Sequence, residues 1–293
     1  MSVSQQAQVE RFCKYLRVRN YSAHTVENYA IDLRLFFEQA AKTPGEVTWR
    51  DVDRFVEGQH ARGLAATTIN RRLNAVKHFF DFLAGESESS GVNPVRPSHH
   101  LRTGRPLPKR LSSEQVRRLF SVINNPVDKA LFLLMLRCGL RVSEVARLKA
   151  SEVDWEQGAV FVSQGKGRKD RSVYMSPDAT AALRECLKLR PAKVAGDRLF
   201  WNQKRKGSEL SVKAIQKKME RYTKAAGIKA SCHSLRHTFA SNLLEEGAEV
   251  VSIKEFLGHS SVTSSERYAR LSNRRVKQTY LQTMRKVISK TKV

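Results

Sequence analysis

A proline-rich stretch limits what this chain can fold into, because it separates two regions of regular apolar periodicity. Proline lacks a backbone N–H and fixes one backbone dihedral, so closely spaced prolines exclude a helix or a central strand. We therefore predict a linker at residues 91–110 between domains at residues 1–90 and 111–293, and two domains also suit a chain of 293 residues. The prolines of this stretch are Pro94, Pro97, Pro106 and Pro108.

The charge of the chain indicates a polyanionic partner. Lysine and arginine outnumber aspartate and glutamate by 53 to 28, which gives a net charge of +25 and a pI of about 10.3. Nucleic acid attracts such a surface. A ribosomal type of RNA-binding protein and a basic membrane-surface protein are the alternatives. No apolar run approaches the ~20 residues of a membrane span and no signal peptide opens the chain, so we expect a cytoplasmic protein without membrane contact.

Neither the cysteines nor the paired histidines predict a metal site. The cysteines are scattered without a Cys-x-x-Cys pair, so we expect no disulfide framework and no zinc. His99 and His100 lack further ligands at metal-binding spacing, and we expect them to be solvated or to contact phosphate within the linker. The cysteines are Cys13, Cys138, Cys186 and Cys232.

The sequence predicts that residues 1–90 are helical throughout. The clearest period is an apolar stripe at steps of four and three residues, and basic side chains lie off this stripe. A solvated charged face is the commoner fate of such residues, but the charge of the whole chain favours phosphate contact. The stripe consists of Ile69, Leu73, Val76, Phe80 and Leu83, and the basic residues are Arg71, Arg72 and Lys77.

The second domain opens with an apolar helix that ends at Gly139, followed by a second helix start. Ser143 is expected to cap this helix, and Arg141 stands just before it, beside the positive end of the helix dipole. Arg141 is therefore placed to hold a phosphate. The alternative is a structural ion pair with a nearby carboxylate.

Two β-like runs, residues 154–163 and 170–176, flank a basic glycine-containing tip at residues 165–169. They predict a hairpin, so the fold class is mainly α with a small antiparallel β-sheet. Gly165 and Lys166 do not form a P-loop, because the earlier glycine and the following Ser or Thr of that motif are missing. We expect no ATP binding.

The last quarter of the chain carries groups that suit attack on a phosphodiester. That reaction needs a nucleophile, donors for the non-bridging oxygens and an acid for the leaving oxygen. His233 and Arg236, three apart at a helix start, can converge on one phosphate. His259 follows a helix end at Gly258, and Tyr268 comes nine residues later. Leu235, Phe239 and Leu243 form the strip that we expect to be buried beneath this helix.

These motifs together closely resemble the tyrosine recombinase (phage integrase) family, and the Xer type in particular. The motifs are Gly-Leu-Arg141-Val-Ser-Glu144, His233-Ser-Leu-Arg236-His-Thr-Phe-Ala, Leu-Gly-His259 and Tyr268. The resemblance implies that Arg141 and Arg236 neutralise the scissile phosphate, with Glu144 in support. It further implies that His259 donates a hydrogen bond, Tyr268 attacks to leave a 3′-phosphotyrosyl link, Lys166 protonates the leaving 5′-oxygen and His233 helps to remove the tyrosine proton.

The resemblance also implies the architecture and the partners. A helical, SAM-like core-binding domain and an α+β catalytic domain would form a clamp around double-stranded DNA. A homotetramer, or a paired recombinase, would join two recombination sites through a Holliday junction, using a C-terminal exchange helix. No metal and no cofactor is implied. The candidate DNA-contacting residues are Arg71, Arg72, Lys77, Arg105 and Arg168.

A type IB topoisomerase and a non-catalytic DNA-binding regulator are the alternatives. The topoisomerase shares the chemistry, but the short first domain favours recombination. The regulator shares the charge without needing the catalytic set. The expected location is the cytoplasm, in association with the nucleoid.

Overall fold

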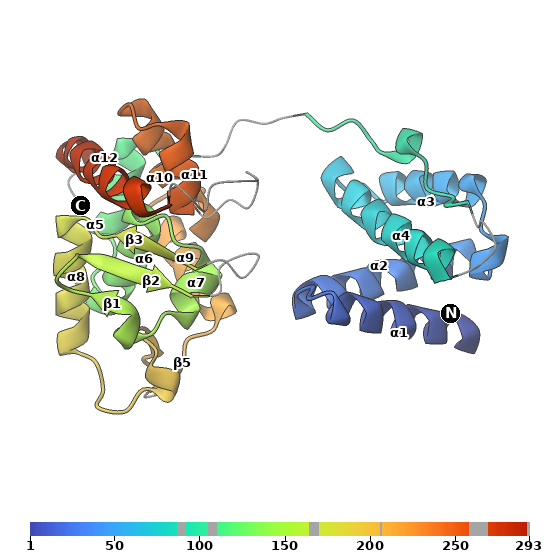
Figure 1. Ribbon diagram of the computed structural model, residues 1–293, viewed down its shortest axis with the longest axis horizontal. Helices are drawn as coiled ribbons and strands as arrows, with labels where there is room; N and C mark the ends of the chain where they lie inside the picture. The colour runs from blue at the N-terminus through green and yellow to red at the C-terminus, as the bar shows by residue number, and fades with distance from the viewer. Residues whose placement is uncertain (87–91, 105–109, 164–169, 206, 258–268, 292–293) are drawn as a thin grey trace. The chain divides into compact units, whose positions relative to one another are not determined.

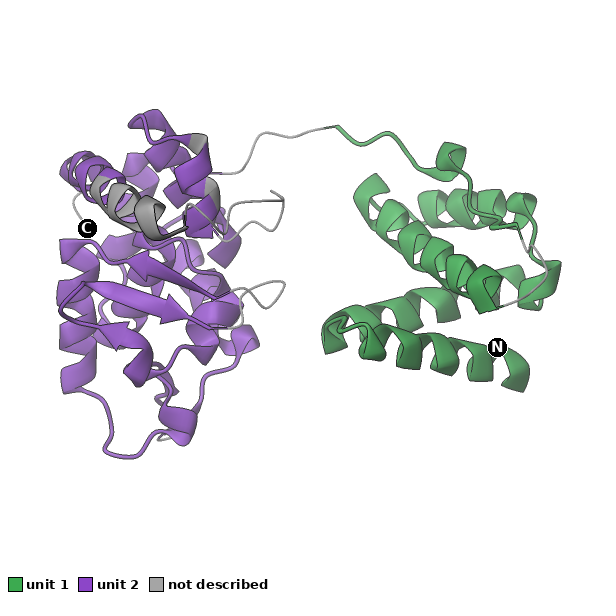
Figure 2. Cartoon of the chain, viewed as in Figure 1, with its two compact units in different colours: residues 1–106 green, residues 107–293 purple. Residues whose placement is uncertain are grey.

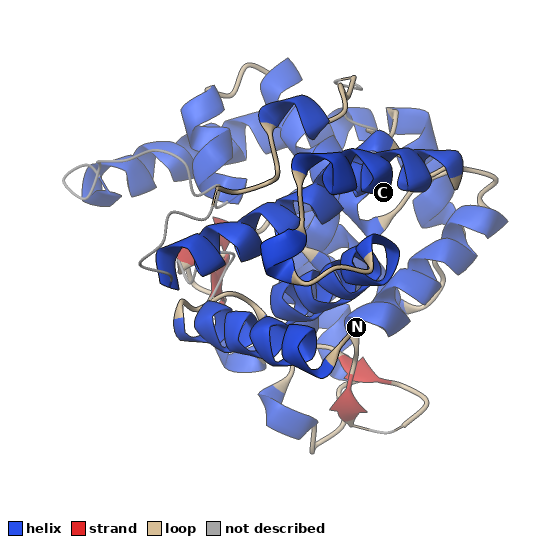
Figure 3. Ribbon diagram, turned by 90° about the vertical axis from the view of Figure 1, so that its right-hand side faces the viewer, coloured by secondary structure: helices blue, strands red, loops and turns tan. Residues whose placement is uncertain are grey.

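The computed structural model describes residues 1–86, 92–104, 110–163, 170–205, 207–257 and 269–291. The chain divides into two compact units, Met1–Pro106 and Leu107–Val293, which Figure 2 colours separately. Helices make up most of the described chain, with few and short strands (Figure 3). The predicted fold class, mainly α with a small antiparallel sheet, is confirmed.

The first unit is helical, as predicted. It contains α1 (Val3–Val18), α2 (Ala23–Ala40), α3 (Trp49–Ala61) and α4 (Ala66–Glu86), with the short η1 (Pro44–Glu46). Ser22 caps α2, because its side chain accepts a hydrogen bond from the backbone N–H of Thr25. The apolar stripe of α4 meets aromatic rings of the other helices in edge-to-face pairs, the arrangement that ring quadrupoles favour. Examples are Phe80 of the stripe with Phe36, and the adjacent Phe79 with Phe37.

The segment after α4 packs on the first unit, so the expectation of solvated histidines there is wrong for His99. His99, in η2 (Pro97–His99), is only 4% exposed. Its Nδ1 accepts from the backbone N–H of Arg96 at 2.9 Å, and burial lowers the pKa of His99. The carboxamide of Asn70 holds both the N–H and the carbonyl of Leu101. Val95 is also buried, so this part of the predicted linker is packed despite its proline-rich composition.

The second unit is built around α6 (Pro126–Arg137), whose residues from Ala130 onward are buried on every side. Around it lie α5 (Ser113–Ser121), α7 (Val142–Arg147), α8 (Pro177–Lys188), α9 (Val212–Ala225), α10 (Cys232–Glu245), α11 (Val250–Leu257) and α12 (Ala269–Thr291). Figure 1 shows these elements with their labels. A helix that is apolar all round belongs inside a domain, which explains the central place of α6.

The predicted hairpin is present. Strands β1 (Val153–Asp154), β2 (Ala159–Val162) and β3 (Arg171–Tyr174) form an antiparallel sheet in that order, with Val160 opposite Val173. A second pair consists of β4 (Trp201–Asn202) and β5 (Ser208–Glu209). The short η3 (Ala150–Glu152) and η4 (Ala195–Asp197) precede β1 and β4. The hairpin tip, with Lys166 and Arg168, lies outside the described residues.

The C-terminal helix α12 packs on its own unit, beside α5 and α10 (Figure 1). Tyr280, Met284 and Val287 are buried with Phe239 and Leu243 of α10. The hydroxyl of Tyr280 donates to the backbone carbonyl of Arg137 at 2.9 Å. The sequence left open whether this helix docks on its own chain or on a neighbour, and in the single chain it docks on its own unit.

Within the described part of the chain, no helix combines the length and apolar character that a bilayer crossing requires.

Candidate active site

Helix α10 carries two of the predicted catalytic residues. Ser231 caps it, so the helix starts just before His233. Leu235, Phe239 and Leu243 are 0%, 2% and 0% exposed, which confirms the predicted buried strip. That strip fixes the rotation of the helix, and Arg236, next to it, is itself 4% exposed.

The buried guanidinium of Arg236 binds two backbone carbonyls. Its Nη1 donates to Gly139 and its Nη2 to Leu257, the last residue of α11, both at 2.5 Å. Burial, together with the charges of Arg141 and Arg171, lowers the pKa of Arg236 to about 9. The group therefore stays cationic at neutral pH, and the N–H groups not used by these carbonyls can serve an anion.

Gly139 allows the turn after α6 to come close to α10. Its φ is +65°, and a Cβ there would lie 2.5 Å from the Phe239 ring. Only glycine adopts this conformation without cost, so the turn after α6 can bring its carbonyl to Arg236. The turn ends at α7, and the predicted cap at Ser143 is wrong. Arg141 is the N-cap residue, and Glu144 accepts its backbone N–H at 2.7 Å, because a glutamate in the third helical position reaches back over the turn.

Glu144 is a buried carboxylate surrounded by arginines. It accepts from Nη1 of Arg141 at 2.7 Å and from both terminal nitrogens of Arg171 at 2.9 Å, and Nη1 of Arg236 lies 3.8 Å away. Burial alone would raise the pKa of Glu144, but the hydrogen bonds and charges of Arg171 and Arg141 outweigh it and lower the pKa to about 2. The carboxylate is therefore ionised at neutral pH and holds the arginines in one place.

Arg171 is a member of this cluster that the sequence analysis missed. It opens β3, opposite Val162, and was read only as part of a strand. Its Nε also donates to the carbonyl of Phe256 at 2.9 Å. A charged residue at the start of a strand is an ordinary surface pattern, so nothing in the local sequence signals this role.

His233 is exposed at the N-terminal turn of α10, and its ring meets the ring of His237 edge-on, with centroids 4.2 Å apart. Partial desolvation of the ring, followed by the charges of His237, Arg236 and Arg141, lowers the pKa of His233. The imidazole is therefore neutral at physiological pH and able to accept a proton.

The structure thus brings together Arg141, Glu144 and Arg236, and the charges of both arginines act on His233 at the start of α10. Three further predicted catalytic residues, Lys166, His259 and Tyr268, lie outside the described residues, as do Arg105 and Arg168. In the chain, His259 is the second residue after the end of α11.

The predicted DNA-contacting residues of α4 make internal pairs. Arg71 donates to both oxygens of the buried Asp32, Arg72 donates to Gln59, and Lys77 pairs with Asp81 at 3.0 Å. The Arg71 and Lys77 side chains are still 46% and 47% exposed, whereas that of Arg72 is 18% exposed. Arg71 and Lys77 are therefore more accessible to a partner than Arg72.

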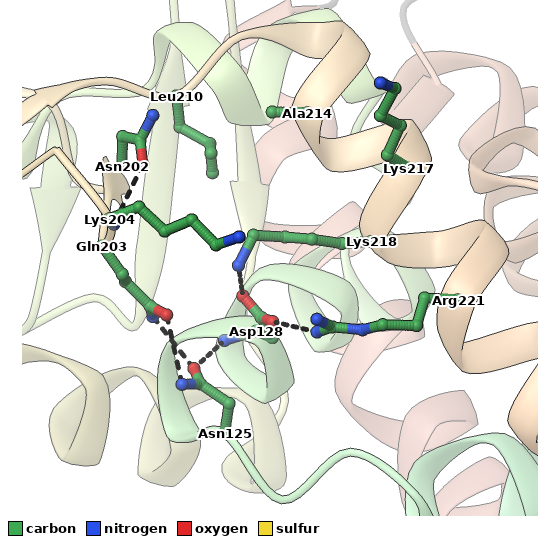
Figure 4. Close-up of a pocket in the computed structure, with 10 residues that line it drawn as sticks. All are labelled: Asn125, Asp128, Asn202, Gln203, Lys204, Leu210, Ala214, Lys217, Lys218 and Arg221. Carbon is green, nitrogen blue, oxygen red and sulfur yellow. Dashed lines mark hydrogen bonds and ion pairs between the residues drawn. The ribbon is translucent and has the colours of Figure 1, made fainter.

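A cavity of about 530 Å³ lies elsewhere in the second unit and shares no residue with the arginine cluster (Figure 4). At its wall, Asp128 of α6 accepts from Lys218 at 2.7 Å and lies 3.8 Å from Arg221, both on α9. Tyr222 donates to the same carboxylate at 2.8 Å. These contacts join α9 to α6. The polar residues at the cavity wall therefore serve to pack these two helices together.

Comparisons with known proteins agree over most of the chain. Residues 109–275 match the phage integrase family, and residues 9–87 match the N-terminal SAM-like domain of phage integrases. Tyrosine recombinase XerA of Pyrococcus furiosus is 32% identical, covering 92% of this chain and 91% of the relative. Tyrosine recombinase XerC of Bacillus subtilis is 33% identical, covering 93% and 94%.

Solved structures share the fold. A XerH site-specific recombinase bound to a palindromic difH substrate aligns with a TM-score of 0.70 at 24% identity, covering 93% of this chain and 83% of that one. A lambda integrase dimer bound to a core site aligns with a TM-score of 0.72 at 17% identity, covering 90% and 97%.

Proposed function

The chain belongs to the phage integrase family of tyrosine recombinases, and from this premise we propose that it cuts and rejoins DNA at specific sites through a 3′-phosphotyrosyl intermediate. The observation that carries the proposal is the cluster in which Arg141 and Arg236 lie around the ionised Glu144. Two guanidinium groups held in one place can neutralise the non-bridging oxygens of one phosphate, where charge develops during attack.

Three groups outside the described residues complete the reaction. Tyr268 attacks the phosphorus, Lys166 protonates the leaving 5′-oxygen, and His259 donates a hydrogen bond to the phosphate. These roles rest on the motifs of the sequence. Because the bond energy is kept in the phosphotyrosyl link, rejoining needs no nucleotide cofactor, and the arginines supply the charge that a metal would otherwise supply.

His233 is proposed to help remove the proton of the nucleophile. An unperturbed tyrosine has a pKa of about 10, so attack near neutrality needs a base or adjacent positive charge. His233 is neutral because its pKa is lowered, and the arginines beside it favour the phenolate. A base and adjacent positive charge are therefore both available, from His233 and from the two arginines, Arg141 and Arg236.

The proposed assembly is a tetramer, or a pair of related recombinases, on two DNA sites with a Holliday junction between strand exchanges. One structural neighbour is a lambda integrase tetramer bound to a Holliday junction. Each chain would close its helical unit and its catalytic unit around DNA as a clamp, and α12 would be the element exchanged between subunits. We place the protein in the cytoplasm, in association with the nucleoid where its DNA lies. The proposed DNA-contacting residues are Arg71, Arg72, Lys77, Arg105 and Arg168.

The test is covalent capture of DNA. The DNA that crosslinks to the protein is sequenced, and the recovered site is made as a duplex nicked beside the cleavage position, which prevents rejoining. The wild-type protein is expected to accumulate a covalent adduct. Tyr268→Phe should abolish the adduct and leave DNA binding unchanged, because only the nucleophilic oxygen is removed.

The matched control is Tyr21→Phe, which removes the hydroxyl of a tyrosine that is 39% exposed in the first unit. It should form the adduct at the wild-type rate. An adduct that persists in Tyr268→Phe would remove Tyr268 as the nucleophile, and a wild-type protein that binds the site without any adduct would favour a non-catalytic regulator.

A further inference from the structure

Arg171 uses all three nitrogens of its guanidinium in the cluster around Glu144. Nη1 and Nη2 donate to the two oxygens of Glu144, and Nε donates to the carbonyl of Phe256, all at 2.9 Å. Its side chain is 10% exposed. One planar fork therefore joins β3, α7 and α11, which come from distant parts of the chain.

The end of α11 is held by two arginines. The last carbonyls of a helix have no partner within the helix and carry partial negative charge. Here Arg171 takes the carbonyl of Phe256 and Arg236 takes that of Leu257. Both arginines face Glu144, which also binds the backbone and side chain of Arg141. The place where α11 ends is thus tied to the groups proposed to hold the phosphate.

We propose that Arg171 is a positioning residue for DNA cleavage, which fixes the end of α11 relative to Arg141 through their shared partner Glu144. This inference rests on the proposed function. His259 follows Leu257 by two residues in the chain. A displaced end of α11 would shift the start of the stretch that carries His259 and Tyr268. The groups that donate to the phosphate and the nucleophile would then no longer be aligned on the same phosphate.

A purely structural ion pair would behave differently. Loss of such a pair lowers the free energy of unfolding, but a protein that still folds and binds DNA would cleave at the normal rate. Loss of a positioning contact lowers the cleavage rate even when DNA is saturating, because misplacement of reacting groups by about 1 Å can cost about 100-fold. The two roles are separated by measuring DNA affinity and single-turnover cleavage on the same folded protein.

The experiment compares Arg171→Gln and Arg171→Lys with wild type on the nicked duplex. Arg171→Gln should bind DNA with unchanged affinity and form the adduct about 10- to 100-fold more slowly at saturating DNA. Arg171→Lys keeps the charge but lacks the planar fork, so its rate should fall between the two. If Arg171→Gln does not fold, as judged by its thermal unfolding transition, the lysine variant carries the test alone.

The matched control is Arg190→Gln. Arg190 also donates to one carboxylate, Asp197 at 2.9 Å, and to one backbone carbonyl, that of Arg198 at 3.3 Å, and its side chain is 20% exposed. Among the described residues its partners are Asp197 and Arg198 and do not include Glu144, so its loss should leave the cleavage rate unchanged. Both variants lose an arginine that joins a carboxylate to a backbone carbonyl, one within the cluster around Glu144 and one outside it.

The pH dependence gives a second readout. Without Arg171, Glu144 loses its largest stabilising partner and its pKa rises towards the ordinary value, so the free energy of unfolding of Arg171→Gln should fall less between about pH 5 and about pH 3 than that of wild type. Cleavage by Arg171→Gln at the wild-type rate, or an equal loss in Arg190→Gln, would overturn the proposal. Failure of the proposed function itself would be seen separately, as a wild-type protein that forms no adduct.

Discussion

Arg137, at the end of α6, donates from Nη2 to the hydroxyl of Thr291, near the end of α12, at 2.8 Å. The guanidinium is 0% exposed, and its Nε binds Asp178 at the start of α8, also at 2.8 Å. A buried arginine therefore connects the C-terminal helix to the central helix. The docking of α12 depends on this polar contact as well as on its apolar face.

Replacement of this arginine should destabilise the second unit. Arg137→Met keeps much of the volume but leaves Asp178 without its cation, and breaking a buried pair costs about 3–5 kcal/mol. Denaturant unfolding measures this loss. Lys188→Met is the control, because Lys188 pairs with Glu185 at the surface and should change stability by less than about 1 kcal/mol. A more stable Arg137→Met would mean that the cost of burying the guanidinium exceeds the gain from its pairing.

Sequence reasoning works for the features that depend on local spacing. The pairing of His233 with Arg236 was predicted because residues three apart share a face on any helix, and the buried strip at Leu235 and Phe239 follows from the same period. The sequence correctly placed Arg141 just before the start of a helix. The side chain that caps this start belongs to Glu144 and not to Ser143. The fold class followed from the same periods, together with the alternating pattern of the hairpin.

The contacts between distant segments could not be read from the sequence. Arg171 reaches Glu144 and Phe256 only after β3 and α11 pack beside α7, and no local pattern encodes that meeting. His99 was assigned to a solvated linker from its proline-rich neighbours, but Asn70 and Val95 attach that segment to the first unit. Composition indicates which regular structures a segment disfavours, whereas its burial depends on the residues against which it packs.

The acid sensitivity of the protein should depend on Glu144. Its pKa in the folded chain is about 2, below the ordinary 4.5, so its stabilising effect is complete above about pH 5 and is lost as pH falls towards 2. The shift predicts a loss of about 2 kcal/mol between about pH 5 and about pH 3. Denaturant unfolding measures the free energy of unfolding at each pH across this range. That free energy should change less with pH for Glu144→Gln than for wild type.

The control for this measurement is Glu185→Gln, because the Glu185 side chain is 59% exposed and pairs only at the surface. Its curve should run parallel to that of wild type. Glu144→Gln should also be less stable at neutral pH, since a carboxamide is a weaker acceptor for Arg141 and Arg171. Parallel curves for all three proteins would show that Glu144 is not held ionised by these arginines.

Two basic residues of α4 should respond differently to removal. Lys77 pairs with Asp81 at the surface, where both side chains are about half exposed, so Lys77→Ala should leave stability nearly unchanged. If Lys77 contacts phosphate in the DNA complex, its loss should weaken binding on every sequence. It should also reduce the slope of log affinity against log salt by about 1. Fluorescence anisotropy at several salt concentrations measures this slope.

Arg71→Ala should act mainly on folding. Asp32 is 1% exposed and takes both of its hydrogen bonds from Arg71, while Arg72 lies 3.7 Å away and compensates only in part. Leaving that carboxylate buried should cost roughly 2–4 kcal/mol in the free energy of unfolding. The salt slope of the folded variant then reports whether the exposed side of Arg71 also meets phosphate. A variant with full stability would show that the pair with Asp32 is dispensable, and an unchanged slope in Lys77→Ala would remove Lys77 from the DNA-contacting set.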